Sequence, residues 1–142
     1  MTLRLTGSDA PLRGMLSALA AFGQGKVVRE LAKKLAPELQ ALGDRPWQRR
    51  ADPDGAPWVP RKGRYLHPML EKTGRTRRSL RARASGTSVV TSVSTPYARF
   101  HQTGTRKMAA RPIFPTRNEL PPVWAARVRK TITDHLKGAI RG

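Results

Sequence analysis

The sequence predicts an α+β fold in which amphipathic helices near both ends of the chain flank a small antiparallel sheet. Two apolar stripes with helical spacing, one beginning at Val27 and one at Val123 or Trp124, predict the helices. The Val- and Thr-rich run from Thr87 to Ser94 is the segment most typical of a strand. A chain of 142 residues has the length of one domain, so we expect a single domain over residues 1–142.

The N-terminal third predicts one strand and two helices. Thr2 to Thr6 alternates polar and apolar residues, which favours a short strand. Apolar residues at helical spacing then predict a first helix that ends near Gly23, with Pro11 in its first turn. A second helix is predicted by one apolar stripe, formed by Val27, Val28, Leu31, Leu35, Leu39 and Leu42.

Two residues are expected to shape this second helix. Proline in a helix interior costs about 3 kcal/mol, so Pro37 predicts a kink or a restart. Gly43 follows the last apolar residue of the stripe and predicts the end of the helix.

A long Pro-rich loop is expected from Asp44 to Pro68. Trp47 and Trp58 are expected to anchor it to the body of the protein, since loops of this length in small domains are usually functional or disordered. Asp52 and Asp54 have the spacing that opens a calcium loop, but the residues after them lack the remaining oxygen ligands. We therefore interpret them as part of a turn rather than as a metal site.

A basic β-hairpin is expected next. Arg75 to Ala84 is too basic for a buried helix and predicts a strand that pairs with Thr87 to Ser94 across Ser85-Gly86. On such a strand the odd-numbered arginines share one face, and arginine suits bidentate contact with phosphate or carboxylate. The alternative is a merely solvated face. The candidates for contact with DNA or an acidic partner are Arg75, Arg77, Arg78, Arg81 and Arg83.

The stretch from Thr95 to Pro115 is rich in aromatic, basic and proline residues. Pro96 is expected to end the strand, because proline cannot donate to a sheet. The residues from Tyr97 to His101 have the spacing of one helical turn, and Gly104 is placed to end it in a left-handed conformation. An exposed basic loop with Arg106 and Lys107 is expected to follow, before the chain returns to the core.

The C-terminal segment predicts a last amphipathic helix. Its apolar stripe continues through Val128, Ile132 and Leu136. Glu119 near the start and Lys137 near the end agree with the helix dipole. We expect this stripe and that of the second helix to be buried against the sheet.

The charge of the chain points to acidic partners. Lys and Arg number 28 against 9 acidic residues, which gives a net charge of +19. Self-repulsion of this size disfavours a compact monomer unless negative charge lies nearby. The longest apolar run, around Met15 to Phe22, is too short to span a bilayer, so we expect no membrane association and a protein made and used in a cytoplasm.

The sequence offers no catalytic set. It has no Cys, which excludes disulfide and thiolate chemistry, and His67, His101 and His135 lie in different predicted elements. His101 has no carboxylate near it in sequence, so we interpret it as a packing, capping or subunit-interface residue. We therefore expect no enzymatic activity and no cofactor or metal.

Three segments in order carry a resemblance to a known family. They are Y-A-R-F-H-Q-T-G-T followed by A-R-P-I-F from Tyr97, D-P-D-G-A-P-W-V-P-R-K from Asp52, and L-E-K-T-G-R-T-R-R-S-L from Leu70. With these, the chain resembles the phage virion morphogenesis family, the tail-completion proteins of Mu-like and related tailed phages. The resemblance extends from Leu3 to Leu136. The unusual wealth of arginine near the third segment departs from the family's pattern and leaves the identity of the partner open.

The resemblance implies a structural protein in the neck or at the head-proximal tail end of the virion, acting in tail completion and head–tail joining. It implies a homo-oligomer, a hexameric ring around the DNA path, that contacts other neck and tail proteins. Arginines of such a ring would face the genomic DNA or acidic partner rings. The candidate residues for subunit or partner interfaces are Trp58, Arg61, Lys62, His101, Gly104, Arg106, Lys107 and Arg111.

A second function class remains open from the sequence. A basic nucleic-acid-binding module, such as a small ribosomal or nucleoid protein, would explain the charge. The amphipathic helices, the Trp-containing loop and the three family-like segments weigh against it. The basic strand also lacks the interleaved aromatic residues on which bases would stack.

Overall fold

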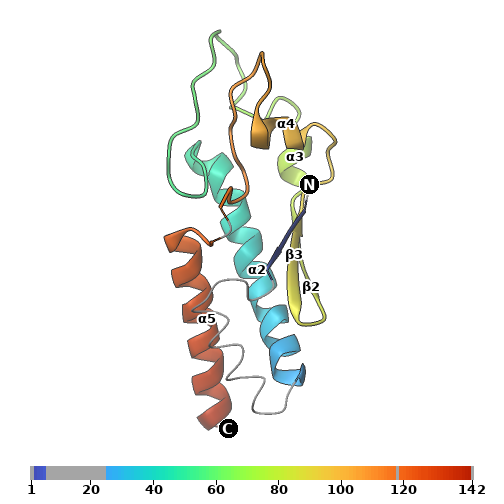
Figure 1. The fold of residues 1–142 in the computed structure, drawn as a ribbon, viewed down its shortest axis with the longest axis vertical. Coiled ribbons are helices and arrows are strands. Elements are labelled where there is room, and N and C mark those ends of the chain that lie inside the picture. The colour runs from blue at the N-terminus through green and yellow to red at the C-terminus, as the bar shows by residue number, and fades with distance from the viewer. Residues whose placement is uncertain (1, 6–24, 118, 142) are drawn as a thin grey trace.

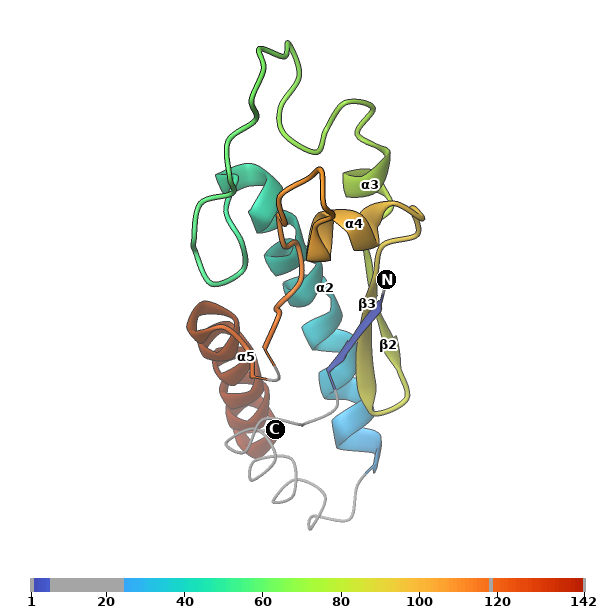
Figure 2. The same cartoon turned by 45° about the horizontal axis from the view of Figure 1, so that its top comes forward.

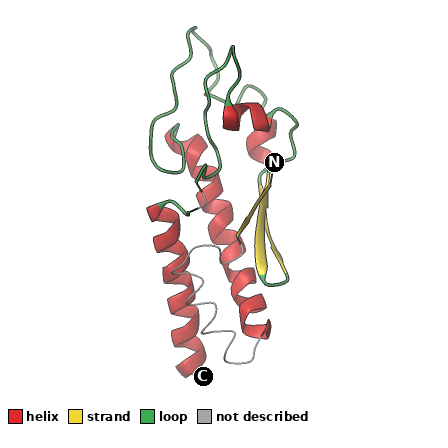
Figure 3. Ribbon diagram, viewed as in Figure 1, coloured by secondary structure: helices red, strands yellow, loops and turns green. Residues whose placement is uncertain are grey.

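The computed structural model describes residues 2–5, 25–117 and 119–141. Figure 1 shows helix α2 running along the length of the molecule, with helix α5 on one side of it and the sheet on the other. Figure 3 shows the loops gathered at one end, beyond the strands. The α+β prediction is therefore confirmed, and the elements are β1 Thr2–Leu5, α2 Gly25–Arg49, α3 Arg75–Arg78, β2 Arg81–Ser85, β3 Ser88–Ser92, α4 Ala98–Thr103 and α5 Pro122–Arg141.

The sheet is antiparallel, with β3 in the centre and β1 and β2 at its edges. The Val- and Thr-rich β3 buries Val89 and Thr91 on one face, as expected for a strand whose residues alternate between two environments. The hairpin turn lies one residue later than predicted, at Gly86-Thr87, because Ser85 pairs with Ser88. Gly86 has a φ of 59°, which suits the two-residue turn that joins paired strands.

Helix α2 is longer than predicted. It continues without interruption through Pro37 and past Gly43 to Arg49, so the expected restart at Pro37 and the expected end at Gly43 are both wrong. Gly43 is buried, and a Cβ atom there would lie 3.1 Å from the side chain of Leu80. This glycine therefore allows close packing inside the helix rather than ending it.

Because α2 extends to Arg49, the Pro-rich loop begins at Arg50 rather than at Asp44 and continues to Gly74. The two tryptophans are buried as expected, Trp47 in the last turns of α2 and Trp58 in the loop itself. The strand predicted from Arg75 is wrong in its first half, where Arg75–Arg78 form the short helix α3. Gly74 has a φ of 66° and starts this helical turn.

Apolar side chains form two clusters. The first fills the space between α2, α5 and β3 and includes Leu31, Leu35, Val89, Val128 and Ile132. The stripe of α5 is buried as predicted, but it packs on α2, which lies between α5 and the sheet (Figure 1). The helix predicted to end near Gly23 lies outside the described residues.

The second cluster joins the end of α2 to the segments that carry the loops. Its members come from α2, the Pro-rich loop, the residues just before β2 and just after β3, α4 and the segment after it. The cluster therefore fixes the loops at one end of the molecule, and it consists of Trp47, Trp58, Leu80, Val93, Ala98, Ile113 and Phe114.

Candidate functional site

Two loops that are far apart in sequence meet at one end of the molecule. Figure 2 shows them beside α3 and α4, and we call residues 50–74 and 104–112 together the loop end. The indole Nε1 of Trp58 donates a hydrogen bond to the carbonyl of Pro112 at 2.9 Å. The guanidinium Nε of Arg111 donates to the carbonyl of Val59 at 2.8 Å. Side chains of each loop thus hold the backbone of the other, and the two loops form one surface.

The basic loop is closed by Gly104. This residue has a φ of 75° and a ψ of 175°, so its backbone is extended with positive φ rather than in the left-handed helical conformation expected. A Cβ at Gly104 would lie 2.8 Å from the backbone nitrogen of Ala110, so the position requires glycine on two grounds. Arg106 and Lys107 are exposed at the tip, as predicted.

Gln102 fixes the point where this loop returns to the core, and the sequence analysis did not single it out. Its side-chain oxygen accepts hydrogen bonds from the backbone nitrogens of Ile113 and Phe114, both at 3.0 Å. Its side-chain nitrogen donates to the carbonyl of Phe114 at 2.8 Å. The sequence feature that could have indicated this role is the H-Q-T-G string, in which Gln102 stands two residues before Gly104.

The Asp52 segment forms a turn, as predicted. The carboxylate of Asp52 accepts a hydrogen bond from the backbone nitrogen of Ala56 at 2.8 Å, and the carbonyl of Asp52 accepts one from Gly55 at 2.9 Å. Within residues 2–5, 25–117 and 119–141, no three His, Cys, Asp or Glu side chains are grouped as a metal ion would require.

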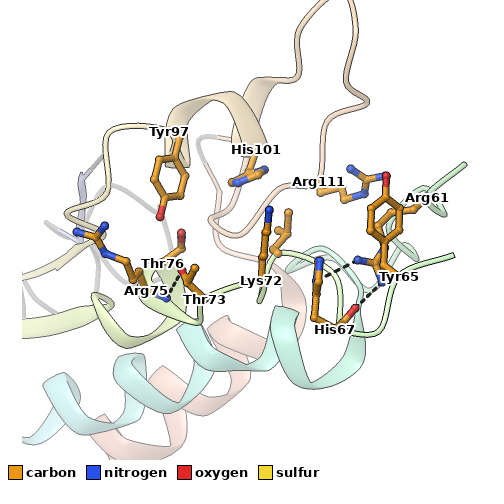
Figure 4. Close-up of a pocket in the computed structure, with 11 residues that line it drawn as sticks. Arg61, Tyr65, His67, Lys72, Thr73, Arg75, Thr76, Tyr97, His101 and Arg111 are labelled. Atoms are coloured by element: carbon orange, nitrogen blue, oxygen red, sulfur yellow. Dashed lines mark hydrogen bonds between the residues drawn. The ribbon is translucent and has the colours of Figure 1, made fainter. Parts of the chain in front are cut away.

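A pocket of about 460 Å³ opens at the loop end between α3, α4 and the Pro-rich loop. It brings together Arg61, His101 and Arg111 from the predicted interface set with Arg75 from the predicted arginine set. Figure 4 shows His101 reaching into the pocket from α4 and Lys72 from the opposite side. Tyr65, Tyr97 and Lys72 also line it, and sequence reasoning missed all three because nothing in their local pattern marks them.

The other predicted interface residues lie elsewhere. Trp58 is 3% exposed and belongs to the second apolar cluster. Lys62, Arg106 and Lys107 are exposed and do not line the pocket. Arg111, which does line the pocket, is only 8% exposed, because its guanidinium turns inward to the carbonyls of the Pro-rich loop.

His101 sits in an unusual environment. Its ring makes an edge contact with Tyr97, with ring centres 6.0 Å apart. Its Nδ1 atom is buried and has no hydrogen-bond partner among the described residues. Burial, together with the smaller effect of the positive charge of Arg111, lowers the pKa of His101 below its ordinary value. The imidazole is therefore held in its neutral form.

The predicted arginine face is only partly present. Arg81 and Arg83 share the outer face of β2, while Arg75 and Arg77 lie on the helix α3, so the four odd-numbered arginines do not form one row. Arg77 is engaged inside the subunit, with its Nε 2.7 Å from the Asp44 carboxylate and its Nη1 2.6 Å from the Glu71 carboxylate. The hydrogen bond from Arg77 is the largest cause of the lowered pKa of Asp44.

A comparison with family models gives a match over nearly the whole chain. The model of the phage virion morphogenesis family matches residues 8–138. The chain belongs to this family. The resemblance found in the three sequence segments is thereby confirmed, and the protein acts in the assembly of bacteriophage virions.

The family is described by its part in virion morphogenesis and not by an enzymatic activity, so membership gives no support for a catalytic role. Searches among curated proteins and among solved structures gave no match. No helix of the described chain has the length and apolar character needed to cross a membrane.

Proposed function

We propose that the protein completes the phage tail and joins it to the head, as a ring of identical subunits in the neck or at the head-proximal tail end. The observation that carries the proposal is the loop end, where two loops are locked together and present exposed side chains at one end of the subunit. A ring forms when each subunit contacts the next through two different surfaces and the rotation closes. Sixfold symmetry is our expectation from the family resemblance.

Exposed apolar side chains support a docking role for the loop end. Three of them lie within the Pro-rich loop, where Val59 is 51%, Tyr65 58% and Leu66 108% exposed. Apolar groups gathered on one surface are typical of protein–protein contacts, and tyrosine is enriched there. A monomer gains nothing from exposing them, whereas a neighbouring subunit or ring would bury them.

Exposed cations support contact with negative charge. Arg106 and Lys107 stand at the tip of the basic loop, and we propose that they meet acidic residues of an adjoining ring. The exposed Arg78, Arg81 and Arg83 are proposed to meet the phosphates of the genomic DNA, without sequence preference. Both contacts would relieve the self-repulsion of a chain with a net charge of +19.

The test is a double charge reversal at the tip of the basic loop. We expect Arg106→Glu with Lys107→Glu to leave the fold intact, because both side chains are exposed, and to give unjoined heads and tails. The fraction of complete virions is counted by negative-stain electron microscopy after complementation of a phage that lacks the wild-type gene.

The matched control is Lys33→Glu with Lys34→Glu, which reverses two adjacent exposed charges on α2. The control is expected to give a normal fraction of complete virions. A normal fraction with the loop variant as well would contradict the role of this loop. Stoichiometric co-purification of the wild-type protein with ribosomes rather than with virions would favour the nucleic-acid-binding alternative.

A further inference from the structure

The pocket at the loop end is strongly cationic. Four of its lining side chains carry positive charge, namely Arg61, Lys72, Arg75 and Arg111, and no lining residue is acidic. The nearest acidic neighbour in sequence, Glu71, is already bound by Arg77 at 2.6 Å. The positive charge in the pocket is therefore not neutralised by the described part of the subunit.

The four cations differ in what they do. Arg61 donates to the carbonyl of His67 at 2.6 Å and lies 4.6 Å from the ring centre of Tyr65, and Arg111 donates to the carbonyls of Val59 and Pro60. These two arginines build the wall of the pocket. The side chains of Lys72 and Arg75 make no hydrogen bond or ion pair within the described residues, although both line the cavity. They remain available to a ligand.

His101 also belongs to the lining of the pocket. The unpaired Nδ1 of His101 is buried, and an unpaired buried polar atom costs free energy. A neutral imidazole carries one N–H donor, which Nδ1 supplies in one of its two tautomers. His101 stands opposite Lys72 in the pocket (Figure 4), so its ring reports the arrival of a ligand there.

Part of the remaining lining is aromatic or apolar. The rings of Tyr65 and Tyr97 and the side chain of Leu70 stand beside the cations. A site with aromatic walls and a few converging charged donors fits a side chain that enters from another molecule. The sugar-phosphate backbone of DNA offers no apolar group to cover these rings, so a protein segment fits the lining better.

We propose that this pocket binds an acidic side chain of another virion protein, carried on a segment with an apolar residue next to the carboxylate. The inference deepens the proposed function, because it gives the chemistry of one docking partner. Charge-assisted hydrogen bonds from Lys72 and Arg75 hold the carboxylate, and the tyrosine rings cover its apolar neighbour.

A second copy of this chain is a poor occupant. With 28 basic and 9 acidic residues, a second copy brings repulsion to the site. Several of those acids are also engaged within their own subunit, as Asp44 and Glu71 are by Arg77, Glu38 by Arg127, and Asp134 by Lys130.

The experiment measures binding of short fluorescein-labelled peptides to the purified full-length protein by fluorescence anisotropy. One peptide alternates Glu and Phe, a second alternates Gln and Phe, and a labelled DNA duplex is the third probe. The variant is Lys72→Gln, and the matched control is Lys33→Gln, which removes the same charge from an exposed site on α2. Both positions are exposed, so both variants are expected to melt like the wild type.

We expect the Glu-containing peptide to bind the wild-type protein and to shift the imidazole NMR signals of His101. Lys72→Gln should weaken this binding about tenfold, the loss expected for a hydrogen bond between charged groups. Lys33→Gln should stay within about twofold, since distant exposed charges contribute little through screened solvent.

Four results would overturn the proposal. They are equal losses in the two variants, equal binding of the Gln-containing peptide, a Lys72 dependence confined to the DNA duplex, and self-association of the protein that disappears in Lys72→Gln. Failure here together with normal head–tail joining in phage would leave the proposed function standing. Peptide binding by a protein that is absent from virions would leave the pocket proposal standing and contradict the proposed function.

Discussion

Single side chains at the loop end connect segments that the sequence keeps apart. Gln102 makes three hydrogen bonds to the backbone of Ile113 and Phe114, and so closes the basic loop from inside. Arg77 bridges Asp44 at the end of α2 and Glu71 in the Pro-rich loop. Gln102 and Arg77 therefore have structural roles. Lys72, by contrast, faces the pocket and has no hydrogen-bond or ion-pair partner among the described residues.

His101 makes a prediction about pH at this scale. Its pKa is lower in the folded chain than its ordinary 6.5, so the folded state binds fewer protons at this residue than the unfolded state. The contribution of His101 to the stability of the folded state is fully present above its ordinary pKa of 6.5 and is lost as the pH falls through the lowered pKa. We expect the wild-type melting temperature to fall between pH 7 and pH 5, and to fall less in His101→Gln.

The internal control for this measurement is a melt of both proteins at pH 8. At pH 8 His101 is neutral in both the folded and the unfolded wild type. Any difference in melting temperature between the wild type and the variant at this pH therefore reports packing rather than protonation. An identical pH dependence of the variant and the wild type would show that His101 does not carry the effect.

At the scale of elements, local patterns predicted most of the structure. The apolar stripes of α2 and α5, the hairpin of β2 and β3 and the helical turn of α4 all follow from spacing over a few residues. Three features depend on contacts between distant segments and could not be predicted this way. Gly43 is kept small by Leu80, the α3 segment is fixed by the ion pairs of Arg77, and the pocket is assembled from four separate stretches of chain.

The buried stripes make a prediction about stability. Leu31 on α2 and Ile132 on α5 are each 1% exposed and belong to the same cluster. Truncating either to Ala should cost about 2–5 kcal/mol of unfolding free energy, because the side chain is lost and a cavity is left. Urea denaturation followed by circular dichroism measures the cost. Lys33→Ala, on the exposed face of α2, should stay within about 0.5 kcal/mol of the wild type, and equal stability of all three variants would refute the packing described.

At the scale of the whole molecule, the two ends differ in kind. The end formed by α2, α5 and the hairpin is an ordinary two-sided packing of helices and sheet (Figures 1 and 3). The loop end exposes apolar side chains, free cations and a cationic pocket instead. With a net charge of +19, the isolated chain gains from any partner that brings negative charge, which is why we expect it to be monomeric or weakly associated alone and ordered as a ring in the virion.

The most direct test of the neck-ring assignment is cryo-electron microscopy of purified infectious particles, with the neck averaged separately. We expect density for a closed ring of identical copies of this chain between head and tail, with the loop end against an adjoining ring or subunit. Neck density that other proteins fill completely, in particles from which this chain is absent, would contradict it.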